Sequence, residues 1–589
     1  MRKNIVLIIV GICLIGISVA MVFVLANKKE NVVIVAKKQI AQVKKQTQMP
    51  IIAFITPHHL VADDLIEDIF NKTFQQNKNS DIDKIILISP NHFNVKGGNI
   101  IVDNESLLND LGVNSLLDKK LIYADSSVFA KEHGIQNILP FINKYFPDMP
   151  VLSMMIRAGT NKNEIEKLAY ELSKDEGFAN TLFILSSDFS HELTPQLSDM
   201  HDKVAIDTIE HFDFDNVYNL DTDCVEGLYL LMKVSQFKDY NKFNFVDGSN
   251  SSKEYNNFFI GDNTSYVTGQ FVAESDDEIV DLGRVVSLSF GGDVMLDRTV
   301  RQNIDRLGAE YFTKDIKRIF WAQDVNMANL EGPVTNNPSV SNVSQDNPNH
   351  FKFTFDPIQT KNFLDFNRVN AVSIGNNHIL NFGAEGVAQT EEFLQQNNVF
   401  YVGTPREDAK NIVYKDINGK KIAFVPYNDF APPSIGKTLD SIKQAKQNSD
   451  IVIIFTHWGQ EYNKKMTNLQ REQAHQFIDA GAKVVIGAHP HVIEPIETYR
   501  EGVIFYSLGN FVFDQFFDED VKERLLVHML VDENNKLQFV LTPLYTRSYG
   551  KLELADDVRR KKVLQEIATN SAVDEKLKEK IIEGKFEIN

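Results

Sequence analysis

Short apolar runs alternate with amphipathic segments along most of the chain. In the first half, four runs are rich in β-branched residues and bounded by polar residues, a pattern typical of buried strands. These runs lie within residues 51–59, 84–93, 151–157 and 181–191. Residues 63–76 and 162–175, between the runs, have apolar positions at helical spacing. Strands that alternate with helices predict an α/β domain built on a sheet.

The same alternation starts again near Val285. Six apolar runs end in the sequences GGDVML, NLEGP, SIGNNH, FTHWG, GAHPHV and YSLGNF. Helical segments such as residues 468–481 separate most of these runs. A second α/β unit is therefore predicted.

The two cycles predict an α/β protein with two domains. The acidic stretch 274–284 separates the cycles and has the composition of a linker. We predict one domain at residues 49–275, a linker at 276–284 and a second domain at 285–550. The charged segment 551–589 is predicted to be a C-terminal helical appendage with no chemistry of its own.

The first 27 residues are predicted to be a transmembrane anchor. Residues 5–26 contain no charged residue and are long enough to cross a bilayer as a helix. A cleaved signal peptide is the alternative, because Val24-Leu25-Ala26 could serve as a cleavage site. The apolar run is longer than a usual signal core, which favours the anchor. Residues 28–48 are polar and free of glycine and proline, which predicts a helical stalk.

Composition excludes several classes of protein. With 589 residues, 43% hydrophobic and 24% charged, the chain has a globular composition and is too long for one core. Its formal charge of −19 argues against nucleic acid as a partner, because a phosphate backbone requires a basic face. Cys13 lies in the apolar N-terminal run and Cys224 stands alone beyond it, so no disulfide is expected within the folded part.

Residues with metal-ligand chemistry follow the predicted strands of the second half, where open α/β sheets place their sites. The candidates are Asp293, Glu331, Asn376, Asn377, His378, His457, His489 and His491. Carboxylate, amide oxygen and imidazole form a mixed set that suits Zn, Mn or Fe(II) rather than Ca. Each residue alone could be a turn residue, a helix cap or a hydrogen-bonded core histidine. Together they favour a metal site.

These segments resemble the CapA family, which is named for poly-γ-glutamate capsule biosynthesis. The motifs GGDVMLDR, NLEGPVT, SIGNNHILNFG, HWGQEY, GAHPHV and YSLGNFVFDQ occur in this order over about residues 285–550. The resemblance implies a fold similar to that of the calcineurin-like metallophosphoesterases, an αββα sandwich. It also implies one or two divalent metal ions, which would be Mn, Fe or Zn.

The resemblance also implies roles for individual residues. His378 would be the general acid of a metal-assisted hydrolysis or transfer. The implied metal ligands are Asp293, Glu331, Asn377, His457, His489 and His491, with Glu331 as the expected bridge and Asn329 and Asn376 in support. One departure is Met295, which stands where a metallophosphoesterase has a histidine. This departure weakens the first metal position.

A second set of candidate ligands follows the strands of the first half. The set consists of His58, His92, Glu132, His133, Asp188, His191 and Cys224. Two or three histidines with one cysteine could hold Fe, Cu or Zn. Cys224 could equally be a small buried hydrophobe, and His133 and Asp188 could be ordinary loop or cap residues.

The first half resembles the Memo family, including the B component of a system that pairs a Memo-like protein with a radical-SAM protein. The matching pieces are TPHH, ISPNHF, KEHGIQNILPFI and SSDFSH, over about residues 50–275. The family is similar in fold to the extradiol dioxygenases of the LigB type. His58, His92 and Cys224 match its metal-binding positions, so the resemblance implies a metal site without naming a reaction.

The leading hypothesis is a membrane-anchored, metal-dependent hydrolase or transferase that makes or anchors an envelope or capsule polymer. The alternatives are a Memo-like redox or dioxygenase enzyme and a non-catalytic envelope scaffold with structural metals. Lysines between residues 28 and 45 favour a cytoplasmic location by the positive-inside rule. An envelope role requires the opposite, so we expect a single-pass protein of the cell membrane with extracytoplasmic domains. The sequence does not indicate an oligomeric state.

Overall fold

The computed structural model describes residues 50–588. Within this range it leaves out residues 96, 105–107, 109–114, 258–260, 274–282, 345 and 407–410. The expected membrane segment and stalk lie outside the described residues and stay predictions. In the described part of the chain, no helix combines the length and the apolarity needed to cross a bilayer.

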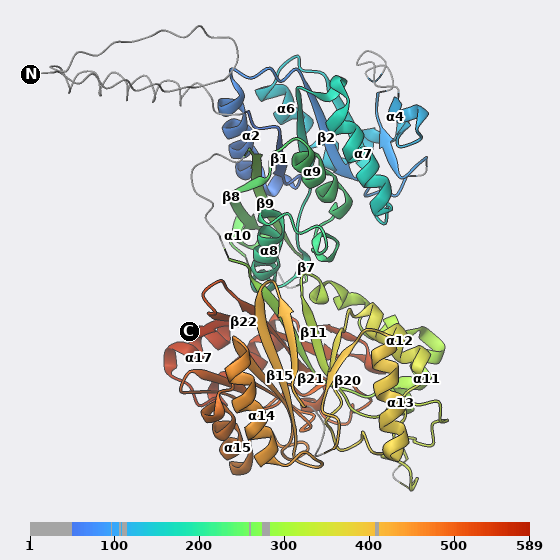
Figure 1. The fold of residues 1–589 in the computed structure, drawn as a ribbon, viewed down its shortest axis with the longest axis vertical. Helices are drawn as coiled ribbons and strands as arrows, with labels where there is room; N and C mark the ends of the chain where they lie inside the picture. Colours follow the sequence, from blue (N-terminus) through green and yellow to red (C-terminus); the bar gives the residue numbers. More distant parts are fainter. Residues whose placement is uncertain are drawn as a thin grey trace, which may run out of the picture. The chain divides into compact units, whose positions relative to one another are not determined.

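The N-terminal domain is built on a mixed sheet with the strand order β4-β3-β5-β2-β6-β1-β9-β7, and β8 pairs with β9 (Figure 1). The strands are β1 (Ala53–Thr56), β2 (Lys84–Pro90), β3 (Ile100–Val102), β4 (Tyr123–Ala124), β5 (Val151–Ile156), β6 (Thr181–Ser186), β7 (His191–Leu193), β8 (Lys242–Asn250) and β9 (Asn263–Val272). The four predicted strands are confirmed as β1, β2, β5 and β6, which run parallel.

Helices cover both faces of this sheet, which explains why its central strands are continuous apolar runs. Successive residues of a strand point to opposite faces. Phe54 therefore packs in the cluster of α2 (Asp63–Asn77), and Ile55 packs in the cluster of α7 (Lys162–Lys174) and α9 (Val225–Phe237). Helices α2 and α7 confirm the two helices predicted at 63–76 and 162–175.

The C-terminal domain consists of two sheets packed face to face. The first has the order β13-β12-β11-β10-β21-β22-β23, with β20 on β10 and β24 on β22; the second has the order β14-β15-β16-β17-β19-β18. The strands of the first sheet are β10 (Val286–Val294), β11 (Val325–Leu330), β12 (Ala371–Ser373), β13 (Phe400–Val402), β20 (Asn510–Val512), β21 (Glu523–Val531), β22 (Leu537–Thr546), β23 (Leu552–Leu554) and β24 (Lys585–Ile588). Those of the second are β14 (Val413–Ile417), β15 (Lys420–Asn428), β16 (Ile451–His457), β17 (Val484–Ala488), β18 (Ile496–Tyr499) and β19 (Gly502–Phe505).

Apolar side chains of the two sheets meet in one core, and helices cover the outer faces. Leu288 and Phe290 of the first sheet belong to the same buried cluster as Ile453 and Ile486 of the second. Helices α14 (Ile435–Asn448) and α15 (Asn468–Ala480) pack on the second sheet. Helices α11 (Arg298–Leu307), α12 (Pro357–Phe366) and α13 (Gly383–Gln396) carry the side chains that cover the first. The result is a four-layer αββα sandwich.

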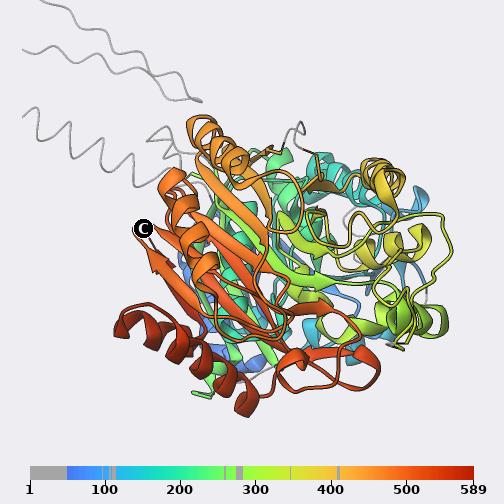
Figure 2. The same cartoon turned by 90° about the horizontal axis from the view of Figure 1, so that it is seen from below.

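The C-terminal segment contributes strands as well as helices to this sandwich. It contains α16 (Asp557–Asn570) and α17 (Glu575–Glu583), which lie beside the red strands in Figure 2. Strand β23 pairs with residues 544–546 of β22, and β24 pairs with residues 537–540 of the same strand. Leu564 and Phe586 are buried in the core between the sheets. The segment predicted as a helical appendage is thus an integral part of the second domain's fold.

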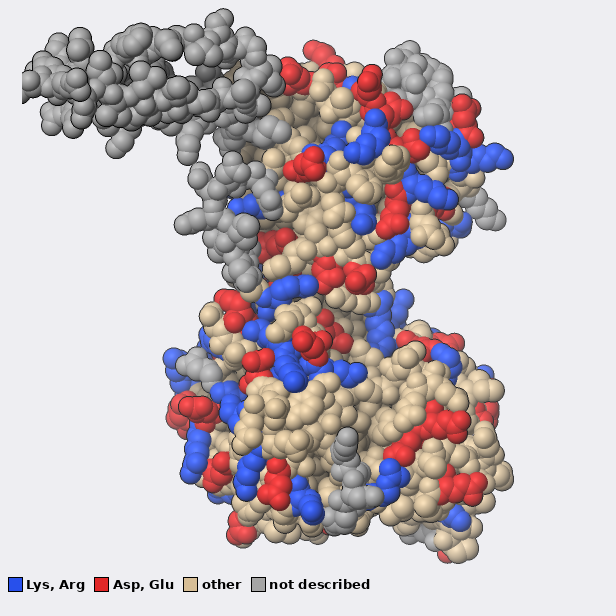
Figure 3. Space-filling view, viewed as in Figure 1, with Lys and Arg blue, Asp and Glu red and all other residues tan. Residues whose placement is uncertain are grey.

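Acidic and basic side chains are interspersed over the face shown in Figure 3.

Candidate metal centres

The strand ends of the C-terminal domain deliver the predicted ligands to one place. In chain order these are Asp293 on β10, Glu331 after β11, Asn377 and His378 after β12, His457 on β16, and His489 and His491 after β17. Strands β10, β11 and β12 run parallel in the first sheet, and β16 and β17 run parallel in the second. Their carboxyl ends therefore lie at one edge of the sandwich.

The His489-Pro490-His491 turn has an unusual backbone. A Cβ atom on Gly487 would lie 1.9 Å from the carbonyl oxygen of Tyr506, so only glycine fits before the turn. His489 and His491 have φ angles of 98° and 59°, in the left-handed region that residues with a Cβ rarely adopt. Backbone strain of this kind persists where the surrounding structure imposes it, which is typical of ligand-binding sites.

Asp293, Glu331 and His491 form the first group that could hold a metal ion. His491 Nδ1 lies 3.2 Å from Asp293 Oδ2, and His491 Nε2 lies 3.9 Å from Glu331 Oε1. The ligand atoms of all three lie within 4.8 Å of one another. All three side chains are buried, so they are pre-arranged before any ion arrives.

Glu331, His457 and His489 form the second group. His457 Nε2 lies 3.1 Å from His489 Nδ1 and 2.9 Å from Asn377 Oδ1. The ligand atoms of the three members lie within 4.8 Å of one another. Since Glu331 belongs to both groups, it occupies the position expected of a bridging carboxylate.

Glu331 carries the clearest sign that this place suits a cation. Its side chain is fully buried, and neither carboxylate oxygen has a hydrogen-bond partner among the described residues. Burial and the nearby Asp293 carboxylate hold the pKa of Glu331 well above its usual range. A buried carboxylate without a partner is costly, and a cation between the groups would supply that partner. The imidazole, carboxylate and amide donors therefore fit Zn, Mn or Fe(II).

His457, His489 and Asp293 have the protonation states that metal binding requires. Burial, and after it the neighbouring imidazoles, lowers the pKa of His457 well below its usual value and that of His489 to about 4. Burial raises the pKa of Asp293, but hydrogen bonds from His491 and Asn329 outweigh burial and bring it below its usual value. Neutral imidazoles and an ionised carboxylate are the forms that coordinate metals.

His378 lies beside the centre and belongs to neither group. Its Nε2 is 3.9 Å from Glu331 Oε1, and its Nδ1 is 3.2 Å from Asn381 Oδ1. The backbone N–H of His378 donates to Asn376 Oδ1 at 3.1 Å, and the ring packs against Phe353 with a centroid distance of 4.3 Å. These contacts fix the ring with Nε2 toward the centre, which suits a residue that moves a proton.

Asparagines hold the ligands in place. Asn329 Nδ2 donates to Asp293 Oδ1 at 2.7 Å, and Asn376 Nδ2 donates to Asn329 Oδ1 at 3.2 Å. Asn510 was not among the predicted residues, although its Oδ1 lies 2.9 Å from His491 Nδ1. The motif YSLGNF indicated this strand end, but a single asparagine carries no metal-binding pattern of its own.

Met295 has a structural role. Its side chain is fully buried, and its sulfur accepts a hydrogen bond from the backbone N–H of Asp297 at 3.1 Å. Because a methionine stands here, the first group contains a single histidine, His491.

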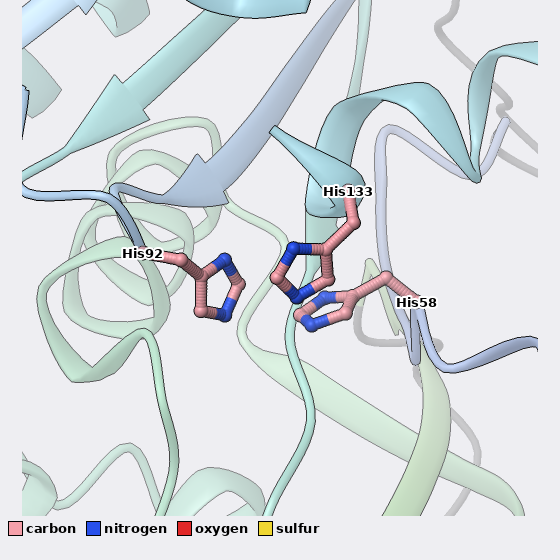
Figure 4. A group of neighbouring side chains, drawn as sticks. All are labelled: His58, His92 and His133. Carbon is pink, nitrogen blue, oxygen red and sulfur yellow. The ribbon is translucent and has the colours of Figure 1, made fainter. Parts of the chain in front are cut away.

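A further candidate centre lies in the N-terminal domain, where three imidazoles converge (Figure 4). His58 follows β1, His92 follows β2, and His133 begins the short helix α5 (His133–Gln136). Their ligand atoms lie within 4.8 Å of one another. Glu132 Oε1 lies 2.6 Å from His92 Nδ1, which orients that ring.

His58 also belongs to a group with two carboxylates. Its Nε2 lies 3.5 Å from Asp188 Oδ2 and 3.3 Å from Asp223 Oδ2. Burial raises the pKa of Asp223, but the imidazoles of His58 and His92 outweigh burial and bring it to about 2. Asp223 was not among the predicted ligands, because a single aspartate before Cys224 has no metal-binding pattern of its own.

Cys224 and His191 lie outside both of these groups among the described residues. Cys224 is buried directly before α9, and burial holds the pKa of its thiol well above the usual value. A protonated thiol is a poorer metal ligand than a thiolate. The structure therefore places His133 and Asp223, rather than Cys224, beside His58 and His92.

Glu494, three residues after the His489-Pro490-His491 turn, predicts a pH-dependent stability. It is 2% exposed, Gln470 Nε2 donates to its Oε2 at 2.8 Å, and burial raises its pKa to about 8. Between about pH 4.3 and pH 8 the unfolded chain loses this proton while the folded chain keeps it, so stability falls as pH rises, by up to about 1.4 kcal/mol per unit. Glu494→Gln should remove this fall.

The measurement is thermal unfolding of both proteins at pH 5 and pH 8. The variant should exceed the wild type in Tm at pH 8 and match it more closely at pH 5. Glu501→Gln, at an exposed position, is the control. An equal decline in wild type and Glu494→Gln would contradict the prediction.

The αββα sandwich, with two overlapping ligand groups at its strand ends, defines a metallophosphoesterase-like protein. Comparison with known families agrees with this class. Residues 287–515 match the family model described as bacterial capsule synthesis protein PGA_cap. Residues 21–257 match the model of the Memo-like proteins.

Individual relatives support the same assignment. The PGA biosynthesis protein CapA of Bacillus subtilis (strain 168) is 33% identical over 307 residues, covering 49% of this chain and 79% of that protein. The capsule biosynthesis protein CapA of Bacillus anthracis is 27% identical, covering 49% and 74%. A probable polyglutamine synthesis accessory protein of Mycobacterium tuberculosis (strain CDC 1551 / Oshkosh) is 24% identical, covering 39% and 75%. The chain belongs to the CapA family and carries a Memo-like domain in its N-terminal half.

Proposed function

We propose that the C-terminal domain is a metal-dependent hydrolase or transferase that makes or anchors an envelope or capsule polymer of the poly-γ-glutamate type. The observation that carries the proposal is the buried Glu331 carboxylate, which is shared by two ligand groups and has no hydrogen-bond partner among the described residues. The names of the relatives, which refer to PGA and capsule biosynthesis, support the polymer class.

The residues of this chain divide into those that hold a metal and those that orient them. Asp293 and His491 with Glu331 would hold one ion, and His457 and His489 with Glu331 would hold another. Bound divalent ions would supply Lewis-acid stabilisation of negative charge at the reacting group. Asn329 donates a hydrogen bond to Asp293, and Asn510 accepts one from His491, which keeps these ligand side chains in position.

His378 is proposed to carry the proton of the reaction at Nε2. Burial lowers the pKa of this imidazole to about 4, so the resting ring is neutral. Nδ1 faces the amide oxygen of Asn381 and therefore bears the ring hydrogen, which leaves the lone pair of Nε2 directed toward the centre. An anionic group opposite Nε2 would favour uptake of a proton, which His378 could then deliver to a leaving oxygen or nitrogen.

The hydrolase proposal can be tested on the purified full chain. After loading with Mn²⁺ or Zn²⁺, metal content is measured by plasma mass spectrometry, and cleavage is assayed with bis(p-nitrophenyl) phosphate and with γ-glutamyl oligomers. We expect metal-dependent cleavage of at least one substrate. Stoichiometric metal without cleavage of either would contradict the hydrolase and favour a scaffold with structural metals.

We also propose that residues 5–26 anchor the chain in the membrane with its domains outside the cytoplasm. The uncharged length of this segment supports the anchor, and the name of a relative, a capsule biosynthesis protein, supports the topology. Protease added to intact cells should digest the domains. Full protection would place them in the cytoplasm.

A second proposed site is a metal centre in the Memo-like domain, which could hold Fe, Cu or Zn. Because His133 lies with His58 and His92 while Cys224 does not, His133→Ala and His92→Ala should each lower the metal content of the full chain by about one equivalent. Cys224→Ser should leave the metal content unchanged. Elemental analysis of the purified variants checks these outcomes.

The matched control for this centre is His59→Ala. His59 is adjacent in sequence to His58, but its Nδ1 lies 2.7 Å from the hydroxyl of Tyr266 and it belongs to neither group. Loss of metal from Cys224→Ser together with retention in His133→Ala would restore the His-His-Cys set that the family resemblance implies.

A further inference from the structure

Two exposed aromatic rings flank the His489-Pro490-His491 turn. Phe430 is 47% exposed, and its ring centroid lies 4.4 Å from that of His489. Tyr462 is 44% exposed, and its ring centroid lies 5.9 Å from that of His491. Each ring thus contacts a candidate metal ligand while presenting much of its surface to the solvent.

The main chain positions both rings. Phe430 follows β15, and its backbone N–H donates to Asn428 Oδ1 at 3.1 Å. The backbone N–H of Tyr462 donates to the carbonyl oxygen of Pro490 at 2.8 Å, and its hydroxyl accepts a hydrogen bond from Gln515 Nε2 at 3.0 Å. Tyr462 is therefore tied directly to the turn that carries His489 and His491.

A third ring extends the aromatic surface. Phe517 is 68% exposed, and its ring packs edge-on against Tyr462 with a centroid distance of 5.2 Å. Exposed aromatic surface next to a site of polar chemistry is an established mark of ligand contact, because such rings gain free energy when a ligand covers them.

The charges near these rings disfavour an anionic chain. Glu461 directly precedes Tyr462 and is exposed. Asp429 is exposed directly beside Phe430. Arg298 is 6% exposed and is paired with Asp514, and Lys464 is paired with Asp520 and Glu566. An exposed carboxylate thus stands next to each ring in the sequence, and carboxylates accept hydrogen bonds from hydroxyls but repel anions.

We infer that Phe430 and Tyr462 form the walls of a subsite for an uncharged sugar ring of the substrate or acceptor, next to the bond held at the metal centre. This inference rests on the proposed function and adds a substrate class to it. The apolar face of a sugar would pack on the aromatic rings, and its hydroxyls would donate to Glu461 or Asp429. A polymer joined to a glycan would meet both requirements.

The test measures binding rather than cleavage, so it does not depend on the hydrolase proposal. The probe is the uncharged trimer of N-acetylglucosamine, titrated into the full chain with EDTA and followed by saturation-transfer NMR. Phe430→Ala and Tyr462→Ala should each weaken binding about tenfold, the value of one aromatic contact. Tyr462→Phe, which keeps the ring, should retain most of the affinity and shows that the fold is intact. Tyr170→Ala on α7, where Tyr170 is 53% exposed, is the matched control and should bind like the wild type.

The outcomes separate the two proposals. Trimer binding that depends on both rings supports the sugar subsite even if no cleavage is found. No trimer binding, or equal affinity in the wild type and both alanine variants, overturns it even if the protein is an active hydrolase. Tighter, ring-dependent binding of a γ-glutamyl hexamer would also overturn it and assign the rings to the anionic polymer.

Discussion

Glu331→Gln should lose metal from both ligand groups and lower the hydrolytic activity by at least about a hundredfold. Glu331 is the single residue common to the two groups, so the change removes a ligand from each. Changing residues that only support metal ligands already costs about 10- to 100-fold, and Glu331 would be a direct ligand. Elemental analysis and steady-state kinetics on the same preparations measure the two effects.

The stability of Glu331→Gln provides an independent check. Ions that bind only the folded wild type should stabilise it by about 2.7 kcal/mol at a free concentration of 100 times Kd, and this gain should be absent from the variant. Without metal, the variant should be at least as stable as the wild type, because the fully buried carboxylate has no hydrogen-bond partner to lose among the described residues.

The control for this prediction is Glu392→Gln on the exposed side of α13. It makes the same chemical change away from both groups and should retain metal, activity and metal-dependent stabilisation. Full metal content in Glu331→Gln would show that this carboxylate is not a shared ligand.

His378→Ala should lower the rate of cleavage by about 10² to 10⁴ while the metal content stays at the wild-type level. Loss of a general acid or base typically has a kinetic effect of this size. His378 lies at the centre but belongs to neither ligand group, so the ions should remain bound. Single-turnover kinetics with metal-loaded protein separates the chemical step from substrate binding.

His475→Ala is the matched control for His378→Ala. His475 stacks on Tyr499 at a centroid distance of 3.7 Å and hydrogen-bonds to Glu497, outside both groups. Its removal should leave the cleavage rate unchanged. A His378→Ala variant that cleaves at the wild-type rate would remove this residue from the mechanism, and one that loses metal would make it a ligand.

Much of the fold could be predicted from local pattern because the central strands of the N-terminal sheet are buried on both faces. Such strands appear in the sequence as short apolar runs, and β1, β2, β5 and β6 were found this way. Strands β23 and β24 were not, because with three and four residues they are too short to show a periodic pattern. Their place is set by pairing with β22, a long-range contact that periodicity does not report.

The same distinction applies to the candidate sites. Asp293, Glu331, His457, His489 and His491 could be proposed because parallel strands bring their carboxyl ends to one edge, so sequence position implies proximity. In the Memo-like domain, Asp223 and Cys224 are neighbours in sequence, and only the turn before α9 decides which of them faces His58. If this turn were shifted by one residue, the thiol of Cys224 would face His58 in place of the carboxylate of Asp223.

The sequence by itself determined the two α/β units, their motifs and the chemical type of the ligands, because these depend on local patterns and on strand ends. Tertiary structure alone decided which ligands share each group with Glu331, that its oxygens lack hydrogen-bond partners among the described residues, and that Phe430 and Tyr462 border the His489-Pro490-His491 turn. The physical reason is that these properties depend on distances between residues from different strands and loops. Such distances are set by packing of the two sheets and have no counterpart in local sequence.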